Sequence, residues 1–219
     1  MKVKLVSNIL DANTAMAAEN RRRFQQEKIF VLNLMSAPGA GKTSILEKTI
    51  ARLKDRVSMA VIEGDICTTK DAERIAALGV EAVQINTDGA CHLDANMMAS
   101  ALANLELNSL DLLVVENVGN LVCPAEFDLG EDLKAMVLSV TEGNDKPFKY
   151  PLMFRESKAI LVNKIDLLPY TEFDVEALRR DLAEINPGAE VFLVSARTGE
   201  GIEAWASWLE RKVKEKKDF

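Results

Sequence analysis

The chain has 219 residues, 48% of them hydrophobic, and a formal net charge of −7. This length and hydrophobic content suffice for the core of one α/β domain, and we expect a single domain over residues 1–219 because no linker or low-complexity tract divides the sequence. The negative charge, with basic runs only at 21–23 and 212–217, excludes a broad nucleic-acid surface.

Targeting signals are not expected. The first eleven residues are too short and too interrupted for the core of a signal peptide, and no apolar run reaches the length of a membrane span. We therefore expect a cytoplasmic protein with no membrane partner. Three cysteines in that compartment do not form a disulfide framework, so each is a buried small residue, a metal ligand or a reactive thiol.

Apolar, β-branched segments alternate with helix-like segments along the chain. An amphipathic helix over residues 11–28 is predicted as an N-terminal extension (residues 1–28) that packs on the sheet or contributes to self-association. Strands are predicted at 29–35, 57–62, 80–85, 110–115, 159–162 and 191–194. Helices are predicted at 69–78, 94–105, 175–185 and, with two core tryptophans, 202–213, and a loop or lid at 141–154. The alternation indicates an α/β fold, a mostly parallel sheet with helices on both faces.

The segment Ser36-Ala37-Pro38-Gly39-Ala40-Gly41-Lys42-Thr43 follows the first predicted strand and leads into a helix, as a P-loop does. The backbone N–H groups of a P-loop surround phosphate oxygens, Lys42 reaches the β- and γ-phosphates, and the Thr43 hydroxyl binds Mg²⁺. The pattern requires glycine where this chain has Ser36, which is small enough for the turn to survive. We therefore predict a P-loop NTPase, with nucleotide-binding residues Gly39, Ala40, Gly41, Lys42, Thr43 and Ser44.

Two acidic residues end or follow predicted strands at the edge of the sheet where the P-loop lies. Asp65 comes just beyond the strand at 57–62, and Glu116 takes the place of the aspartate in the D-x-x-G element of ordinary GTPases. Phosphoryl transfer mainly requires positioning and charge neutralisation, which Lys42, Mg²⁺ and these acids supply. We expect Lys42, Asp65 and Glu116 to be catalytic, and Thr43, Asp65 and Glu116 to hold Mg²⁺. Which acid binds Mg²⁺ directly is left open, and either acid can instead cap a helix or turn.

A metal site is predicted near the same edge. Cys91 and His92, the only histidine, follow the strand at 80–85, and Cys123 follows the strand that ends near Glu116. Thiolate and imidazole together suit both Zn²⁺ and Ni²⁺. Three donors leave a four-coordinate site incomplete, and a symmetric dimer can supply the rest. Cys67 is expected to be a packed or incidental thiol.

The motif Asn163-Lys164-Ile165-Asp166, after a predicted strand, indicates that the nucleotide carries guanine. The Asp166 carboxylate accepts from guanine N1–H and N2–H₂, a donor pair that adenine lacks. Lys164 lays its stem on the base, and Asn163 ties the recognition loop together. Ser195-Ala196-Arg197 resembles the S-A-K/R element of GTPases, in which a backbone N–H approaches guanine O6. The sequence therefore favours GTP over ATP, with a polar turn as the alternative interpretation of the motif.

These motifs together resemble one known family, the nickel-insertion GTPases of hydrogenase maturation called HypB. The resemblance covers nearly the whole chain, through the segments 36–43, 63–66, 71–74, 91–93, 116–124 and 163–166. It implies a metal site at Cys91, His92 and Cys123 near a dimer interface, GTP-promoted homodimerisation, and delivery of nickel or zinc governed by GTP or GDP. It also implies a HypA-type nickel chaperone and a [NiFe]-hydrogenase large-subunit precursor as partners.

The resemblance leaves alternatives open. Some family members carry an N-terminal cysteine-rich or histidine-rich nickel site; this sequence starts with neither, so nickel storage is not expected. Urease nickel-insertion GTPases share the scaffold but resemble a Cys-Pro-His pattern, whereas Cys91 and His92 are adjacent. A zinc-stabilised module that binds GTP with little turnover is a non-enzyme alternative. An ATP-dependent small-molecule kinase is disfavoured by the guanine motif.

Overall fold

The structure is a computed structural model that describes residues 9–65 and 69–218. Cys67 lies outside the described residues, so its role as a packed thiol stays a prediction. In the described part of the chain, no helix combines the length and the apolar character that crossing a bilayer requires.

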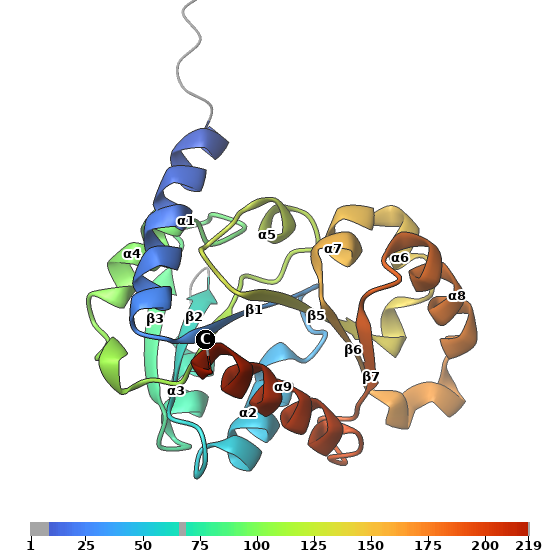
Figure 1. Cartoon of the computed structure of the whole chain (residues 1–219). Helices are drawn as coiled ribbons and strands as arrows, with labels where there is room; N and C mark the ends of the chain where they lie inside the picture. The colour runs from blue at the N-terminus through green and yellow to red at the C-terminus, as the bar shows by residue number, and fades with distance from the viewer. Residues whose placement is uncertain (1–8, 66–68, 219) are drawn as a thin grey trace, which may run out of the picture.

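A seven-stranded, all-parallel sheet forms the centre of the molecule, with strand order β3-β2-β4-β1-β5-β6-β7 (Figure 1). After β1, the chain adds β2, β3 and β4 on one side of it and then β5, β6 and β7 on the other side. The strand order therefore reverses at β1. Ligands of such sheets bind at this reversal, beyond the carboxyl ends of the strands. The strands are β1 (Phe30–Ser36), β2 (Met59–Asp65), β3 (Glu81–Asn86), β4 (Leu112–Glu116), β5 (Leu133–Ser139), β6 (Ala159–Asn163) and β7 (Glu190–Leu193).

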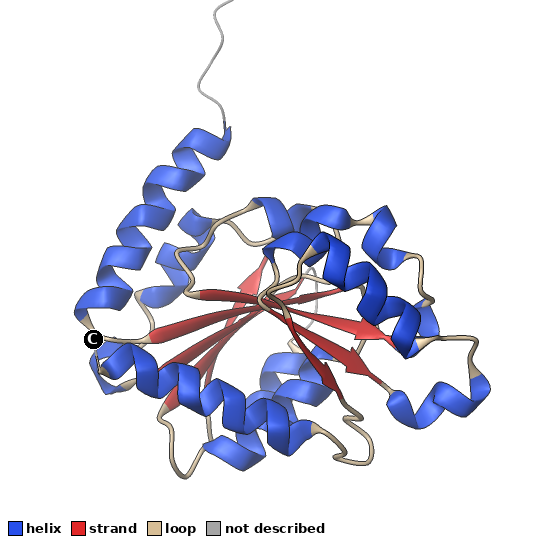
Figure 2. Ribbon diagram, turned by 45° about the vertical axis from the view of Figure 1, so that its right-hand side comes forward, coloured by secondary structure: helices blue, strands red, loops and turns tan. Residues whose placement is uncertain are grey.

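Helices cover both faces of this sheet (Figures 1 and 2). On one face lie α2 (Lys42–Leu53), α3 (Lys70–Ala76) and α9 (Ile202–Lys217). The other face carries two helices beside the β3 side of the sheet, α1 (Ile9–Gln26) and α4 (Ala95–Leu102). It also carries α5 (Cys123–Glu126), α6 (Lys146–Lys149), α7 (Pro151–Glu156) and α8 (Val175–Ile185), with short 3₁₀ turns at Leu107–Ser109, Val140–Glu142 and Ile165–Tyr170.

Side chains of β1 alternate between the two faces, as the period of a strand requires. Phe30, Leu32 and Leu34 join the large core beneath α2 and α9. Val31 and Met35 point to the other face, where they belong to two separate apolar clusters. Between them lies Asn33, a fully buried polar residue on an otherwise apolar strand. A polar seam therefore crosses the second face between its two apolar clusters.

The predicted fold class is confirmed, and most of the predicted elements are present. All six predicted strands are found within three residues at each end, and the helix at 175–185 has the predicted bounds. Both tryptophans are buried in the core, where Trp205 Nε1 donates to Thr49 Oγ1 over 3.1 Å. The predicted N-terminal helix exists as α1, and its Phe24 packs into the cluster beside β1 and α4. Self-association of α1 stays a prediction.

Two parts of the sequence interpretation are wrong. Strand β5 was not predicted, because Lys134 interrupts its apolar pattern; the structure buries most of Lys134 and lets its ammonium donate to Ala125 O over 2.8 Å. The segment 141–154 is not a loop, since it contains α6 and most of α7. Each of these helices begins with a proline in its first turn, where the missing N–H has no cost.

Gly201, just before α9, provides a test of the packing at the α9 terminus. An alanine Cβ there would lie 1.9 Å from Leu193 O, and φ is +72°. Gly199 has φ +86° but open space around a Cβ. We expect G199A to lower the free energy of unfolding by about 1–2 kcal/mol, the cost of a left-handed backbone, and G201A to lower it further, by about 3 kcal/mol or more. Denaturant titration measures both; equal losses would contradict the close approach to β7.

Candidate nucleotide and metal site

The P-loop joins β1 to α2 and has the geometry that its glycines permit. Gly39 and Gly41 have φ of +74° and +101°, and Gly41 is the N-cap of α2. Ser36, which stands where the pattern requires glycine, is the last residue of β1 and is not among the residues with positive φ. Its hydroxyl accepts from Lys42 Nζ over 3.0 Å. The departure from the pattern is therefore accommodated by extended backbone, and the hydroxyl holds the lysine at the loop.

A cavity of about 560 Å³ opens beside the P-loop. Lys42 and Thr43 line it together with the two predicted acids, Asp65 at the end of β2 and Glu116 at the end of β4. The Thr43 hydroxyl donates to Glu116 Oε1 over 2.7 Å. The structure thus brings together Lys42, Thr43, Asp65 and Glu116, the residues predicted for Mg²⁺ and catalysis, whereas Ala40 of the P-loop is buried and does not line the cavity.

Glu63, on β2, is a further acid in this cavity that the sequence analysis did not assign. It is only 2% exposed, and its carboxyl lies within hydrogen-bonding reach of Glu116. Burial and the neighbouring Glu116 carboxylate raise the pKa of Glu63 to about 10. Burial also raises the pKa of Glu116, against the opposing effect of Lys42. The pair therefore retains a proton at neutral pH in the absence of a cation.

The donor set of this cavity fits Mg²⁺. Glu63 Oε1 and Glu116 Oε2 are buried and have no hydrogen-bond donor among residues 9–65 and 69–218. Mg²⁺ prefers hard oxygen ligands, and a divalent cation favours the ionised form of nearby carboxyls. The Thr43 hydroxyl and the carboxyls of Glu63, Asp65 and Glu116 are oxygen donors at the P-loop side of this cavity, and Asp71, which pairs with Arg74, also lines it.

A second cavity, of about 480 Å³, adjoins the first and shares Gly41, Ser44 and Lys164 with it. The predicted guanine-recognition residues Asn163, Lys164, Asp166, Ala196 and Arg197 line this second cavity. Ser195, the remaining predicted residue, lies behind it and donates from its hydroxyl to Asp166 Oδ1 over 2.6 Å. Ser195 therefore fixes the orientation of the Asp166 carboxylate.

Asn163 was predicted to tie the recognition loop together, and in the structure it bonds to the P-loop and to the loop after β7. Its Nδ2 donates to Ala40 O over 2.9 Å, and its Oδ1 accepts from the Ala196 N–H over 3.1 Å. A Cβ on Gly41 would lie 2.4 Å from Asn163 Nδ2, so Gly41 is also required by this contact. Lys164 has left-handed backbone, φ +63°, and donates from Nζ to Gly39 O over 2.8 Å. The loop after β6 and the P-loop are thus assembled as one unit.

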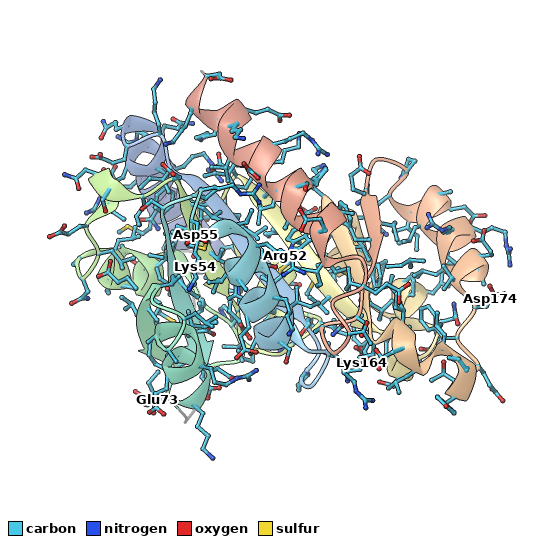
Figure 3. The ribbon with its side chains drawn as sticks, turned by 90° about the horizontal axis from the view of Figure 1, so that it is seen from below. Arg52, Lys54, Asp55, Glu73, Lys164 and Asp174 are labelled. Atoms are coloured by element: carbon cyan, nitrogen blue, oxygen red, sulfur yellow. The ribbon has the colours of Figure 1, made fainter. Side chains whose placement is uncertain are left out.

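Figure 3 shows this edge of the molecule from below. Lys164 lies along the edge where the P-loop begins, and Glu73 of α3 lies toward the same edge. Lys54 and Asp55, at the far end of α2, lie toward the opposite side of the view. The two cavities therefore occupy the carboxyl edge of the sheet, as expected for a parallel α/β fold.

Cys91, His92 and Cys123 come together although 32 residues separate the two cysteines. One ligand atom from each lies within 4.8 Å of the others, and the cysteine Sγ atoms are 2.9 Å apart. Burial lowers the pKa of His92, so its imidazole is neutral, as a metal ligand must be. The hydrogen bond from Cys91 raises the pKa of Cys123, an effect that a bound cation reverses. This donor set suits Ni²⁺ or Zn²⁺.

Comparison with known proteins agrees with this geometry. The model of the CobW/HypB/UreG nucleotide-binding domain matches residues 30–193. The hydrogenase maturation factor HypB of Escherichia coli K12 is 55% identical over 203 residues, covering 93% of this chain and 70% of that protein. A probable HypB of Methanocaldococcus jannaschii is 41% identical and covers 97% of this chain and 96% of its own length. The crystal structure of Helicobacter pylori HypB in complex with nickel superposes with a TM-score of 0.89 at 40% identity, covering 93% of this chain and 96% of that one.

The fold, the P-loop and these matches define a P-loop nucleotide-binding protein of the CobW/HypB/UreG class. Within that class, the chain belongs to the HypB family of hydrogenase maturation factors. The resemblance inferred from its motifs is thereby confirmed.

The pKa of Glu63 leads to a testable prediction on stability. In the unfolded chain a glutamate loses its proton near pH 4.5, whereas the folded protein retains it up to about pH 10, so stability without cation falls as pH rises between these values. E63Q removes this penalty. At pH 8, without metal or nucleotide, we expect E63Q to raise the free energy of unfolding by about 1 kcal/mol and to flatten its pH dependence. The matched control is E203Q, at an exposed carboxylate; parallel curves for wild type and E63Q would contradict the assignment.

Proposed function

We propose that this chain is a GTP-hydrolysing metallochaperone that binds and delivers nickel during [NiFe]-hydrogenase maturation. The main observation behind this proposal is that Cys91, His92 and Cys123 lie close together at one edge of the sheet. At the same edge, the ends of neighbouring strands form a nucleotide cavity. The nickel-bound structure of a 40% identical relative supports nickel as the cargo. Zinc uses the same donors and competes for the site.

The nucleotide in this proposal is GTP. Asp166 is oriented by Ser195 at the wall of the second cavity, so its two oxygens suit the N1–H and N2–H₂ donors of guanine. The shared wall residue Gly41 allows the base to occupy one cavity while the phosphates occupy the other. Asn163, Lys164, Ala196 and Arg197 complete the base site, and the backbone from Gly39 to Ser44 holds the phosphates.

Hydrolysis in this proposal depends on charge neutralisation at the P-loop. Lys42 neutralises the phosphates, and Thr43, Asp65 and Glu116 hold Mg²⁺, with Glu63 as an additional carboxyl. A divalent cation held there would favour the ionised form of the Glu63 and Glu116 pair. The nucleotide state would thus change the charge at the ends of β2 and β4.

Dimerisation completes the metal site in this proposal. Three ligands leave at least one coordination position open, and Val122, next to Cys123, has an exposed apolar side chain that would pack against a second copy. GTP promotes this homodimer. The cytoplasmic partners are a HypA-type nickel chaperone and a [NiFe]-hydrogenase large-subunit precursor, and residues 1–219 act as one domain.

Size-exclusion chromatography with metal analysis tests this function. With a non-hydrolysable GTP analogue and Mg²⁺, we expect a dimer with altered nickel content relative to GDP, and phosphate release from GTP above background. C123A should lose most of the nickel while its GTP affinity stays within about twofold of wild type; E203Q, which changes an exposed carboxylate outside both cavities, is the control for nickel binding. Unchanged nickel stoichiometry in C123A would reject the metal site, and an absence of GTP hydrolysis would favour a zinc-stabilised binding module.

Base selection is tested separately with Asp166. D166N replaces an acceptor of guanine N1–H by an amide, so we expect it to weaken GTP binding by about tenfold or more and to improve binding of XTP. Asp174, which caps α8 with bonds to the Glu176 and Ala177 N–H groups, offers the control D174N. Competition titration against a fluorescent nucleotide measures both variants. An unchanged preference for GTP over XTP in D166N would remove the guanine assignment.

A further inference from the structure

A continuous chain of buried hydrogen bonds crosses the second face of the sheet. Asn117 Nδ2 donates to Asn33 Oδ1 over 3.2 Å, and Asn33 Nδ2 donates to Glu131 Oε1, also over 3.2 Å. The first contact joins residues that are 84 positions apart in the sequence, and the second joins residues that are 98 positions apart. All three side chains are less than 10% exposed. The polar seam between the two apolar clusters therefore has Asn33 at its centre, with Asn117 at one end and Glu131 at the other.

One end of this chain holds the segment that carries His92. Asn117 Oδ1 accepts from the Leu93 N–H over 3.1 Å and from the Val118 N–H over 2.9 Å. Leu93, directly after His92, is fully buried. A Cβ on Gly64 of β2 would lie 2.8 Å from Leu93 Cδ1, so the Leu93 side chain fills the space that Gly64 leaves. The residue after His92 is thus held by both β2 and the segment after β4.

The other end of this chain reaches the helix that carries Cys123. Lys134 Nζ lies 3.7 Å from Glu131 Oε1 and donates to Ala125 O of α5 over 2.8 Å. Since α5 begins at Cys123, the same network holds both loops that supply metal ligands. The two ends of the hydrogen-bonded chain therefore contact the two segments that carry the candidate metal ligands.

Asn117 is also adjacent to the nucleotide cavity. It follows Glu116, whose carboxyl accepts from Thr43 at the P-loop, and it lines the phosphate cavity itself. Its backbone N–H donates to Leu34 O over 2.9 Å, which extends the β1 and β4 pairing by one residue. Because Asn117 directly follows Glu116, a change in the backbone at Glu116 would reach Asn117, and Asn117 is bonded to Leu93.

We propose that Asn117 is a positioning residue that transmits the nucleotide state to the metal site through its bond to the Leu93 N–H. This inference rests on the proposed function, because it names the connection by which GTP and GDP alter nickel binding. The hydrogen bonds of the Asn117 side chain go to Leu93, Val118 and Asn33 and not to Cys91, His92 or Cys123; Asn117 orients the backbone after His92, while Asn33 and Glu131 hold its amide in place.

N117A removes the acceptor for Leu93 and leaves the ligands and the P-loop intact. The measurement is the ratio of nickel dissociation constants with GDP and with a non-hydrolysable GTP analogue. We expect wild type to show a ratio of about fivefold or more in either direction, and N117A a ratio within about twofold of one. N33A, which removes the anchor of the Asn117 amide, should give an intermediate ratio. The control N186A removes three amide hydrogen bonds outside both cavities and should keep the wild-type ratio.

Hydrogen exchange of the peptide 91–95 provides a readout in the wild-type protein, and so does not depend on the folding of N117A. The Leu93 amide should exchange at different rates in the GDP and GTP-analogue states of wild type, and the difference between the two states should be smaller in N33A. A wild-type ratio in folded N117A, or equal exchange in wild type, would overturn the role of Asn117 and leave the proposed function standing. Equal nickel affinity in the two wild-type states would overturn the proposed function, and this inference with it.

Discussion

The parallel pairing of β1 with β4 is the interaction on which both sites depend. Its register places Leu34 opposite Glu116, so the P-loop and the acidic end of β4 leave the sheet side by side. Residues that are far apart in the chain thereby contact each other: Thr43 bonds to Glu116, and Asn117 continues the ladder to Leu34. The segment after Asn117 leads to Cys123. The nucleotide cavity and the segment that leads to Cys123 therefore both begin at the ends of this pair of strands, whereas Cys91 and His92 follow β3.

Much of the fold follows from local sequence pattern, because buried parallel strands have continuous apolar runs and amphipathic helices have a period near 3.6. Lys134 shows where that reasoning fails. A lysine in an apolar run predicts exposure, yet its stem packs in the sheet while its ammonium reaches Ala125 O. The segment 141–154 was misread for a related reason: Pro147 and Pro151 suggested a loop, whereas each proline begins a short helix.

The site residues were predictable from the sequence where they belong to a short motif. The P-loop and the Asn163 to Asp166 segment each require particular residues at fixed spacing, and the structure places both at one edge. Cys91 and His92 were recognisable because the chain has a single histidine. Glu63 and Asn117 belong to no such motif, since their roles arise from contacts between strands. An acid inside an otherwise apolar strand was the available signal for Glu63, and an asparagine directly after Glu116 was the signal for Asn117.

The contact between Gly41 and Asn163 constrains how this chain can diverge. An alanine at position 41 is opposed twice, by a φ of +101° and by the Asn163 amide, 2.4 Å from its Cβ. A lineage that replaced Asn163 would relieve the second obstacle and keep the first. Asn163, and with it base specificity, can therefore change while Gly41 is kept, whereas Gly41 cannot be replaced while Asn163 is present. The geometry therefore constrains the phosphate-binding turn more tightly than the loop that recognises the base.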